Sequence, residues 1–92
     1  MLSALFIDDD ADFLEGIAEI ATQEGFAVST TRSLAGAREH LATHSPELVV
    51  IDLMLPDGKG IDLLRELKDG SSCDVILISG MATVDSATAR PS

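Results

Sequence analysis

Aspartates follow two short apolar runs of this sequence. Asp8, Asp9 and Asp10 come directly after residues 4–7, and Asp52 follows residues 48–51. Carboxylates brought close together are costly, because two like charges ~4 Å apart repel by ~1 kcal/mol in water and ~4 kcal/mol at an effective dielectric of ~20. A cluster of this kind therefore indicates a bound cation or a chemical task, and ligands that are all oxygen favour magnesium.

The two apolar runs predict how these carboxylates come together. Both runs are short and rich in large or β-branched apolar residues, which is typical of buried parallel strands. The carboxyl ends of neighbouring parallel strands meet at one edge of an open α/β sheet, where such folds place their sites. We therefore expect Asp8, Asp9 and Asp52 to lie at the same edge of a sheet.

Strand and helix signals alternate along the whole chain. We expect strands at residues 3–8, 26–31, 47–53 and 74–79, helices between them, and the start of a fourth helix at 84–89. The third helix is expected at 60–68. This alternation predicts a parallel sheet with helices on both faces, joined by right-handed crossovers.

Local signals mark where the helices begin and end. Asp10 and Ser33 are suited to cap the first two helices, and Gly25 is suited to end the first. Residues 55–58 predict a turn, in which proline presets φ and Gly58 tolerates a positive φ. Apolar residues at helical spacing predict the buried face of the first and third helices: Phe13, Leu14, Ile17, Ala18, Ile20 and Ala21 in the first, and Ile61, Leu64 and Leu67 in the third.

Length and composition narrow the class of protein. Ninety-two residues make one small domain at most, and the net charge of −10 disfavours direct binding to nucleic acid or to anionic lipid. No apolar run is long enough to span a membrane, and there is no secretory signal. The single cysteine, Cys73, cannot form an internal disulfide, so we expect a cytoplasmic chain. His40 and His44 fit a solvated helix surface better than a metal site.

Three segments, residues 5–10, 48–60 and 75–80, resemble the receiver domain of two-component response regulators in order and spacing. The resemblance implies the flavodoxin-like, doubly wound α/β fold of CheY-like proteins, with strand order 2-1-3-4-5. Residues 1–92 would then form a single receiver domain with order 2-1-3-4, truncated after strand four, so that the fifth strand and the last helix are missing.

The same resemblance implies a role for each site residue. Asp52 would accept a phosphoryl group from a sensor histidine kinase or a phosphotransfer protein, and Asp8 and Asp9 would hold Mg²⁺ with it. The backbone carbonyl of Met54 would be a further metal ligand, and the hydroxyl of Ser79 would contact the phosphoryl group and act as a switch. Such a domain labels itself once and has no multiple-turnover substrate. Without the cation, clustering should raise the pKa of at least one carboxylate.

The chain departs from the family pattern near its end. The family's strand-five lysine should lie roughly twenty residues beyond Ser79, past Ser92. We therefore expect a fragment of a longer regulator, with weak or absent phospho-signalling. The resemblance implies an output domain outside this segment, which could be a DNA-binding domain. The apolar fourth strand would form an exposed edge, through which we expect self-association.

Two other functions remain open from the sequence. A degenerate receiver would act as a phosphorylation-independent interaction module, an alternative that the missing lysine favours. A haloacid-dehalogenase-like phosphohydrolase would also use an aspartate and Mg²⁺, but it needs an acid two residues beyond the nucleophile, where this chain has Met54. Asp8 and Asp10 do have that spacing.

Overall fold

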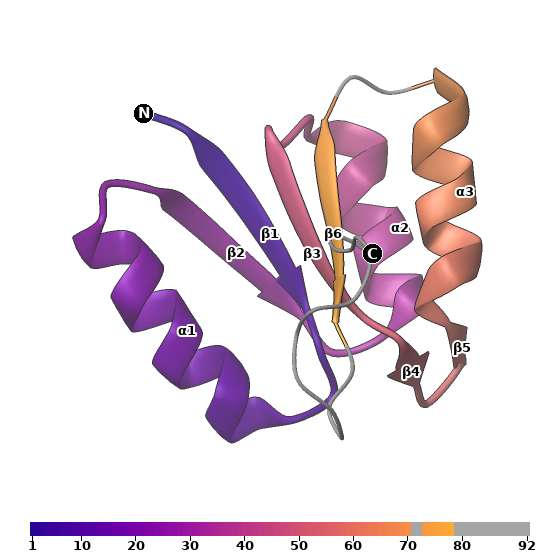
Figure 1. Cartoon of the computed structure of the whole chain (residues 1–92), viewed down its shortest axis with the longest axis horizontal. Helices are drawn as coiled ribbons and strands as arrows, with labels where there is room; N and C mark the ends of the chain where they lie inside the picture. Colours follow the sequence, from indigo (N-terminus) through magenta and orange to yellow (C-terminus); the bar gives the residue numbers. More distant parts are fainter. Residues whose placement is uncertain (71–72, 79–92) are drawn as a thin grey trace, which may run out of the picture.

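A sheet of four parallel strands forms the centre of the structure, a computed structural model that describes residues 1–70 and 73–78. The strands lie in the order β2-β1-β3-β6 (Figure 1). Their bounds are β1 (Ser3–Ile7), β2 (Ala27–Thr31), β3 (Leu48–Asp52) and β6 (Asp74–Ile78). The expected order 2-1-3-4 is confirmed, because β6 is the fourth strand of this sheet along the chain. The helix start expected at 84–89 lies outside the described residues.

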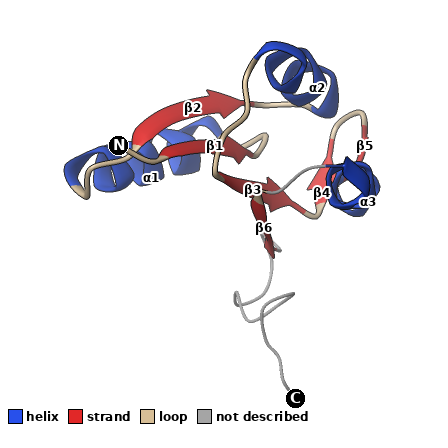
Figure 2. Cartoon of the chain, turned by 90° about the horizontal axis from the view of Figure 1, so that it is seen from above, coloured by secondary structure: helices blue, strands red, loops and turns tan. Residues whose placement is uncertain are grey.

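Helices cover the two faces of the sheet. Helix α1 (Ala11–Gln23) lies on one face, and α2 (Leu34–Thr43) and α3 (Gly60–Gly70) lie on the other (Figure 2). None of these helices, within the part of the chain that the structure describes, is both long and apolar enough to cross a membrane.

The apolar core has two parts because successive residues of a strand point to opposite faces of the sheet. On the side of α2 and α3, Leu5 and Ile7 of β1 pack with buried residues of β3 and of both helices. On the side of α1, Ala4 and Phe6 pack with Leu14. The central strands β1 and β3 are thus covered on the face that carries α2 and α3.

Helix ends follow the local signals of the sequence. A side-chain oxygen of Asp10 accepts hydrogen bonds from the N–H groups of Asp12 (3.0 Å) and Phe13 (3.2 Å), so Asp10 caps α1 as expected. Ser33 caps α2 in the same way. Gly25 has a φ of 98° just after the end of α1, a conformation that glycine adopts without strain. These three predictions are confirmed.

The prediction for the buried face of α3 is partly wrong. Leu63, which we did not expect to face inward, is buried at 1% exposed, whereas Leu64 is only half-buried. Ile61 and Leu67 do pack against the core. Gly60, at the start of the helix, closely approaches the carbonyl of Asp52, and Leu63, one turn further on, packs in the core on this face of the sheet.

The apolar face of α1 is wider than the surface that covers it. Leu14 and Ala21 are buried and Ile17 is half-buried, as expected, but Phe13 is 38% exposed and Ile20 is 57% exposed. The described part of the chain places only one side of α1 against the sheet. Helical spacing alone could not tell which part of the apolar stripe would be covered.

The predicted turn at residues 55–58 is the tip of a small antiparallel hairpin. Its strands are β4 (Met54–Leu55) and β5 (Gly58–Lys59), and they pair Met54 with Lys59 and Leu55 with Gly58. Gly58 has a φ of +154°, where glycine is preferred, as the turn prediction required. The hairpin joins the end of β3 to the start of α3 (Figure 1).

Candidate functional site

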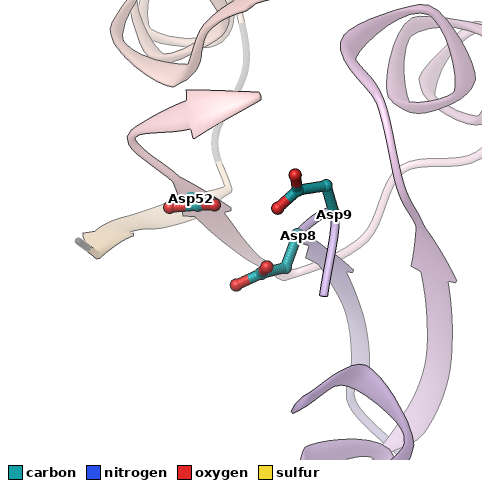
Figure 3. A group of neighbouring side chains, drawn as sticks. All are labelled: Asp8, Asp9 and Asp52. Atoms are coloured by element: carbon teal, nitrogen blue, oxygen red, sulfur yellow. The ribbon is translucent and has the colours of Figure 1, made fainter. Parts of the chain in front are cut away.

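Strands β1 and β3 bring the aspartates to one edge of the sheet. The two strands are parallel neighbours in which Ile7 pairs with Ile51. Asp8 directly follows Ile7, and Asp52 directly follows Ile51. Carboxylate oxygens of Asp8, Asp9 and Asp52 all lie within 4.8 Å of one another. Figure 3 shows the three side chains at the ends of these two strands. The predicted convergence of these carboxylates is confirmed.

Burial differs within this acidic cluster, which consists of Asp8, Asp9 and Asp52. Asp8 and Asp52 are each 6% exposed, whereas Asp9 is exposed to solvent. The cluster therefore has two carboxylates with little access to water and one at its open side. The side of the cluster that faces solvent is therefore the side of Asp9.

Backbone hydrogen bonds hold the ends of the two strands in place. Asp8 donates its N–H to the carbonyl of Thr31 (3.1 Å), and its carboxylate accepts from the N–H of Asp10 (2.9 Å). Leu53, directly after Asp52, donates its N–H to the carbonyl of Ile78 (2.7 Å). Each buried aspartate is thus tied to a neighbouring strand, which restricts its movement.

Burial and repulsion both raise pKa values in the cluster. Loss of hydration raises the pKa of Asp8 above its ordinary value, and the charges of Asp9 and Asp10 add to this, although the N–H of Asp10 acts in the opposite direction. The pKa of Asp52 is raised first by burial and then by the charge of Asp8. The expected rise is confirmed, with burial as the larger cause and clustering as the smaller one.

The donor set of the cluster fits a hard divalent cation. It offers carboxylate oxygens only, and within residues 1–70 and 73–78 no lysine or arginine forms an ion pair with any of the three. Hard cations such as Mg²⁺ and Ca²⁺ prefer oxygen ligands. A bound cation would offset both the free-energy cost of burying charged carboxylates and their mutual repulsion. The residues present therefore fit a metal ion of this class.

The structure places the other predicted residues in different ways. Met54 lies in β4, two residues beyond Asp52, and is 62% exposed, and its carbonyl stays a predicted ligand. Ser79 and the loop expected after it lie outside the described residues. Asp10 caps α1 and is not a member of the cluster, in agreement with its expected role as a helix cap.

Two contacts near the site were not predicted from the sequence. The carboxylate of Asp57 accepts hydrogen bonds from the N–H groups of Leu34 and Ala35, and the guanidinium of Arg32 donates to the carbonyl of Asp9 (3.3 Å). Both contacts join segments more than twenty residues apart. Local patterns carry no signal for such pairs, because they depend on how the loops meet.

Comparison with known proteins gives one family. The family model of the response regulator receiver domain matches residues 4–90. The chain is 31% identical over 88 residues to the photosynthetic apparatus regulatory protein RegA of Cereibacter sphaeroides. This match covers 95% of this chain and 48% of that protein. It is 38% identical to the transcriptional regulatory protein KdpE of Mycobacterium tuberculosis, over 86% of this chain and 35% of that protein. The chain thus spans about half or less of the length of these relatives.

A solved structure supports the same assignment. The MaeR response regulator bound to beryllium trifluoride superposes with a TM-score of 0.79 and 30% sequence identity. The match covers 92% of this chain and 72% of that one. Sequence and architecture therefore point to the same group of proteins.

Proposed function

Because this chain belongs to the response regulator receiver domain family, we propose that Asp52 is the phosphoacceptor through which it receives a signal. One observation carries the proposal: Asp52 ends the central strand β3, is buried, and has the carboxylates of Asp8 and Asp9 within 4.8 Å. A turn-forming aspartate would need neither the burial nor the acidic neighbours. Residues 1–92 act in this proposal as a single receiver domain.

The reaction is transfer of a phosphoryl group to the Asp52 carboxylate. One carboxylate oxygen attacks the phosphorus of a phosphohistidine on a partner kinase or phosphotransfer protein. A new O–P bond forms while the P–N bond breaks, the imidazole leaves with its electron pair and takes a proton from solvent, and Asp52 becomes an acyl phosphate. The chain itself accepts the phosphoryl group and turns over no separate substrate, so it acts as a signalling domain. We place this domain in the cytoplasm.

Metal binding is assigned to the acidic cluster. The carboxylates of Asp8, Asp9 and Asp52 would hold the ion, the backbone carbonyl of Met54 would add an oxygen, and we assign magnesium from this all-oxygen donor set. When bound, the ion neutralises charge on the phosphoryl oxygens during transfer. The hydroxyl of Ser79 would then donate a hydrogen bond to the new phosphoryl group and report its arrival.

The relatives suggest what lies around this step. MaeR binds beryllium trifluoride, which has the shape and charge of a phosphoryl group, and we propose that this chain binds it at Asp52. RegA and KdpE are named as regulatory proteins, and KdpE as a transcriptional one. We therefore propose that a sensor histidine kinase supplies the signal and that an output domain outside this chain acts on DNA.

Labelling with acetyl phosphate and Mg²⁺ tests the proposal. Intact-mass measurement should show one added phosphoryl group, which hydroxylamine removes because it cleaves acyl phosphates. The label should be absent from Asp52→Asn and unchanged in Asp62→Asn, which removes an exposed charge from α3. Label that persists in Asp52→Asn would refute the assignment.

The same measurements separate the alternatives. A folded chain that binds Mg²⁺ but takes no label would favour the phosphorylation-independent interaction module. Many turnovers of a phosphomonoester would favour the haloacid-dehalogenase-like hydrolase. Membership of the receiver domain family and the buried position of Asp52 favour the phosphoacceptor function over the interaction module and the hydrolase.

A further inference from the structure

The hairpin that follows Asp52 is joined to a distant helix by the side chain of Asp57. One carboxylate oxygen accepts a hydrogen bond from the N–H of Leu34 (2.8 Å), and the other accepts from the N–H of Ala35 (2.9 Å). Leu34 and Ala35 are the first two residues of α2, and N–H groups in the first turn of a helix have no acceptor within the helix. A negative charge there is also favoured by the helix dipole.

The ionisation of Asp57 agrees with this contact. The N–H groups of Leu34 and Ala35 hold the pKa of its carboxyl below the ordinary value, because they stabilise the charged form. An aspartate in a turn usually bonds to backbone groups of the same turn. Here both carboxylate oxygens reach a different element, so the side chain links two parts of the fold.

A second contact joins the same two segments. The side chain of Leu34 is 2% exposed and belongs to the same core cluster as Leu55 of the hairpin. A Cβ atom added to Gly58 would lie 2.6 Å from Cδ1 of Leu34, so the hairpin backbone rests directly on this leucine. Asp57 thus holds the backbone of Leu34 while Gly58 covers its side chain.

The other end of the hairpin touches the candidate site. Met54 is two residues beyond Asp52, and the N–H of Gly60 donates to the carbonyl of Leu53 (2.8 Å). A Cβ on Gly60 would collide with the carbonyl oxygen of Asp52. The loop of residues 53–59 is therefore held near Asp52 at its base and at α2 by its tip.

We propose that Asp57 is a positioning residue, whose carboxylate ties the 53–59 loop to the start of α2 and thereby fixes the backbone at Met54 beside the metal and phosphoryl site. This inference rests on the proposed function, since it assigns Met54 a role in metal binding. Asp57 itself lies outside the acidic cluster, and both of its carboxylate oxygens accept hydrogen bonds from α2. Loss of the tie frees the loop tip and costs metal affinity through the backbone.

Magnesium titration of two matched variants tests the tie. Asp57→Ala removes it, and Ser33→Ala removes the other cap of the same helix, a 3.0 Å hydrogen bond from the Gly36 N–H, without touching the loop. By analogy with other groups that orient metal ligands, we expect roughly tenfold weaker Mg²⁺ binding in Asp57→Ala and a change below about twofold in Ser33→Ala. Asp57→Asn keeps one acceptor oxygen and should lie between Asp57→Ala and the unsubstituted chain.

Metal-free amide spectra give an independent readout. Asp57→Ala should shift the signals of residues 53–59 and speed hydrogen exchange at Leu34 and Ala35, whereas Ser33→Ala should leave the loop signals in place. Equal Mg²⁺ affinities in the two variants, or unshifted loop signals in Asp57→Ala, would overturn the inference. An unsubstituted chain without any Mg²⁺ response would instead refute the metal site of the proposed function, and the loop signals would still decide whether Asp57 holds the loop.

Discussion

Replacing Asp8 by asparagine tests whether repulsion among the carboxylates of the acidic cluster lowers the free energy of unfolding in the absence of metal. Asp8 is 6% exposed, and its carboxylate lies within 4.8 Å of those of Asp9 and Asp52. Asparagine has nearly the same shape, and its side-chain oxygen can still accept the hydrogen bond from the Asp10 N–H (2.9 Å). The substitution therefore removes one negative charge with little change in packing.

The size of the effect follows from the separation of the charges. Two charges 4.8 Å apart repel by about 0.9 kcal/mol in water and about 3.5 kcal/mol at an effective dielectric of about 20. The cluster lies at the edge of the sheet, between these two environments. Without metal, we expect Asp8→Asn to have a free energy of unfolding about 1 to 3 kcal/mol higher than the unsubstituted chain.

Magnesium should narrow this difference in stability between Asp8→Asn and the unsubstituted chain. A ligand that binds only the folded state, at a concentration tenfold above its dissociation constant, raises the free energy of unfolding by about 1.4 kcal/mol. We expect the unsubstituted chain to gain stability in this way. Asp8→Asn should gain little, because a neutral amide is a weaker ligand for a hard cation than a carboxylate.

Urea unfolding at neutral pH, in EDTA and in Mg²⁺, measures both effects. Glu19→Gln is the matched control, since it removes the same charge from an exposed position on α1 and should change stability by less than about 0.5 kcal/mol. An Asp8→Asn variant that is no more stable than Glu19→Gln in EDTA would refute the argument from repulsion. Equal stabilisation of variant and parent by Mg²⁺ would refute the role of Asp8 as a ligand.

Two further predictions concern the scaffold. Gly60→Ala should lower the free energy of unfolding by about 1 to 3 kcal/mol, because the added methyl group would collide with the carbonyl of Asp52. Gly16→Ala should raise it by about 0.5 to 1 kcal/mol, because a Cβ at that helical position would meet no other element of the described chain within 4 Å. Thermal unfolding of the two variants should shift in opposite directions, and a shared direction would contradict the contact. The hydroxyl and N–H of Ser3 hold the pKa of Glu47 below its ordinary value, so its contribution to stability is present above about pH 4.5 and is lost as the pH falls through the lowered pKa. The difference in melting temperature between the unsubstituted chain and Glu47→Gln should therefore shrink on acidification, and a difference that stays constant from neutral to acid pH would show that the contact carries no linked proton.

Much of the fold could be predicted because its signals are local. A short apolar run of four residues predicts a buried strand, and an aspartate or serine before a helical pattern predicts a cap, as Asp10 and Ser33 confirm. The alternation of these elements predicted a parallel sheet with helices on both faces, and the resemblance to receiver domains implied the strand order, which the structure has as β2-β1-β3-β6. The convergence of Asp8 and Asp52 then came from the parallel direction of β1 and β3.

Other features could not be predicted because they depend on packing between elements. Leu63 and Leu64 are adjacent leucines, and helical spacing allowed either to be the buried one. The packed fold buries Leu63, in a helix that starts at Gly60 close against the carbonyl of Asp52. The exposure of Phe13 on α1 likewise depends on how much of that helix the sheet covers.

By itself, then, the sequence determined the four strands of the parallel sheet, their shared direction and the edge at which Asp8 and Asp52 meet, because the strand signals and the aspartates that follow them are local. Only the tertiary structure decided that burial outweighs repulsion in raising the pKa of Asp52, and that Asp57 bonds to Leu34. Burial and long-range hydrogen bonds depend on atoms brought together from distant segments. Their partners are chosen by the packed fold, and no local pattern encodes them.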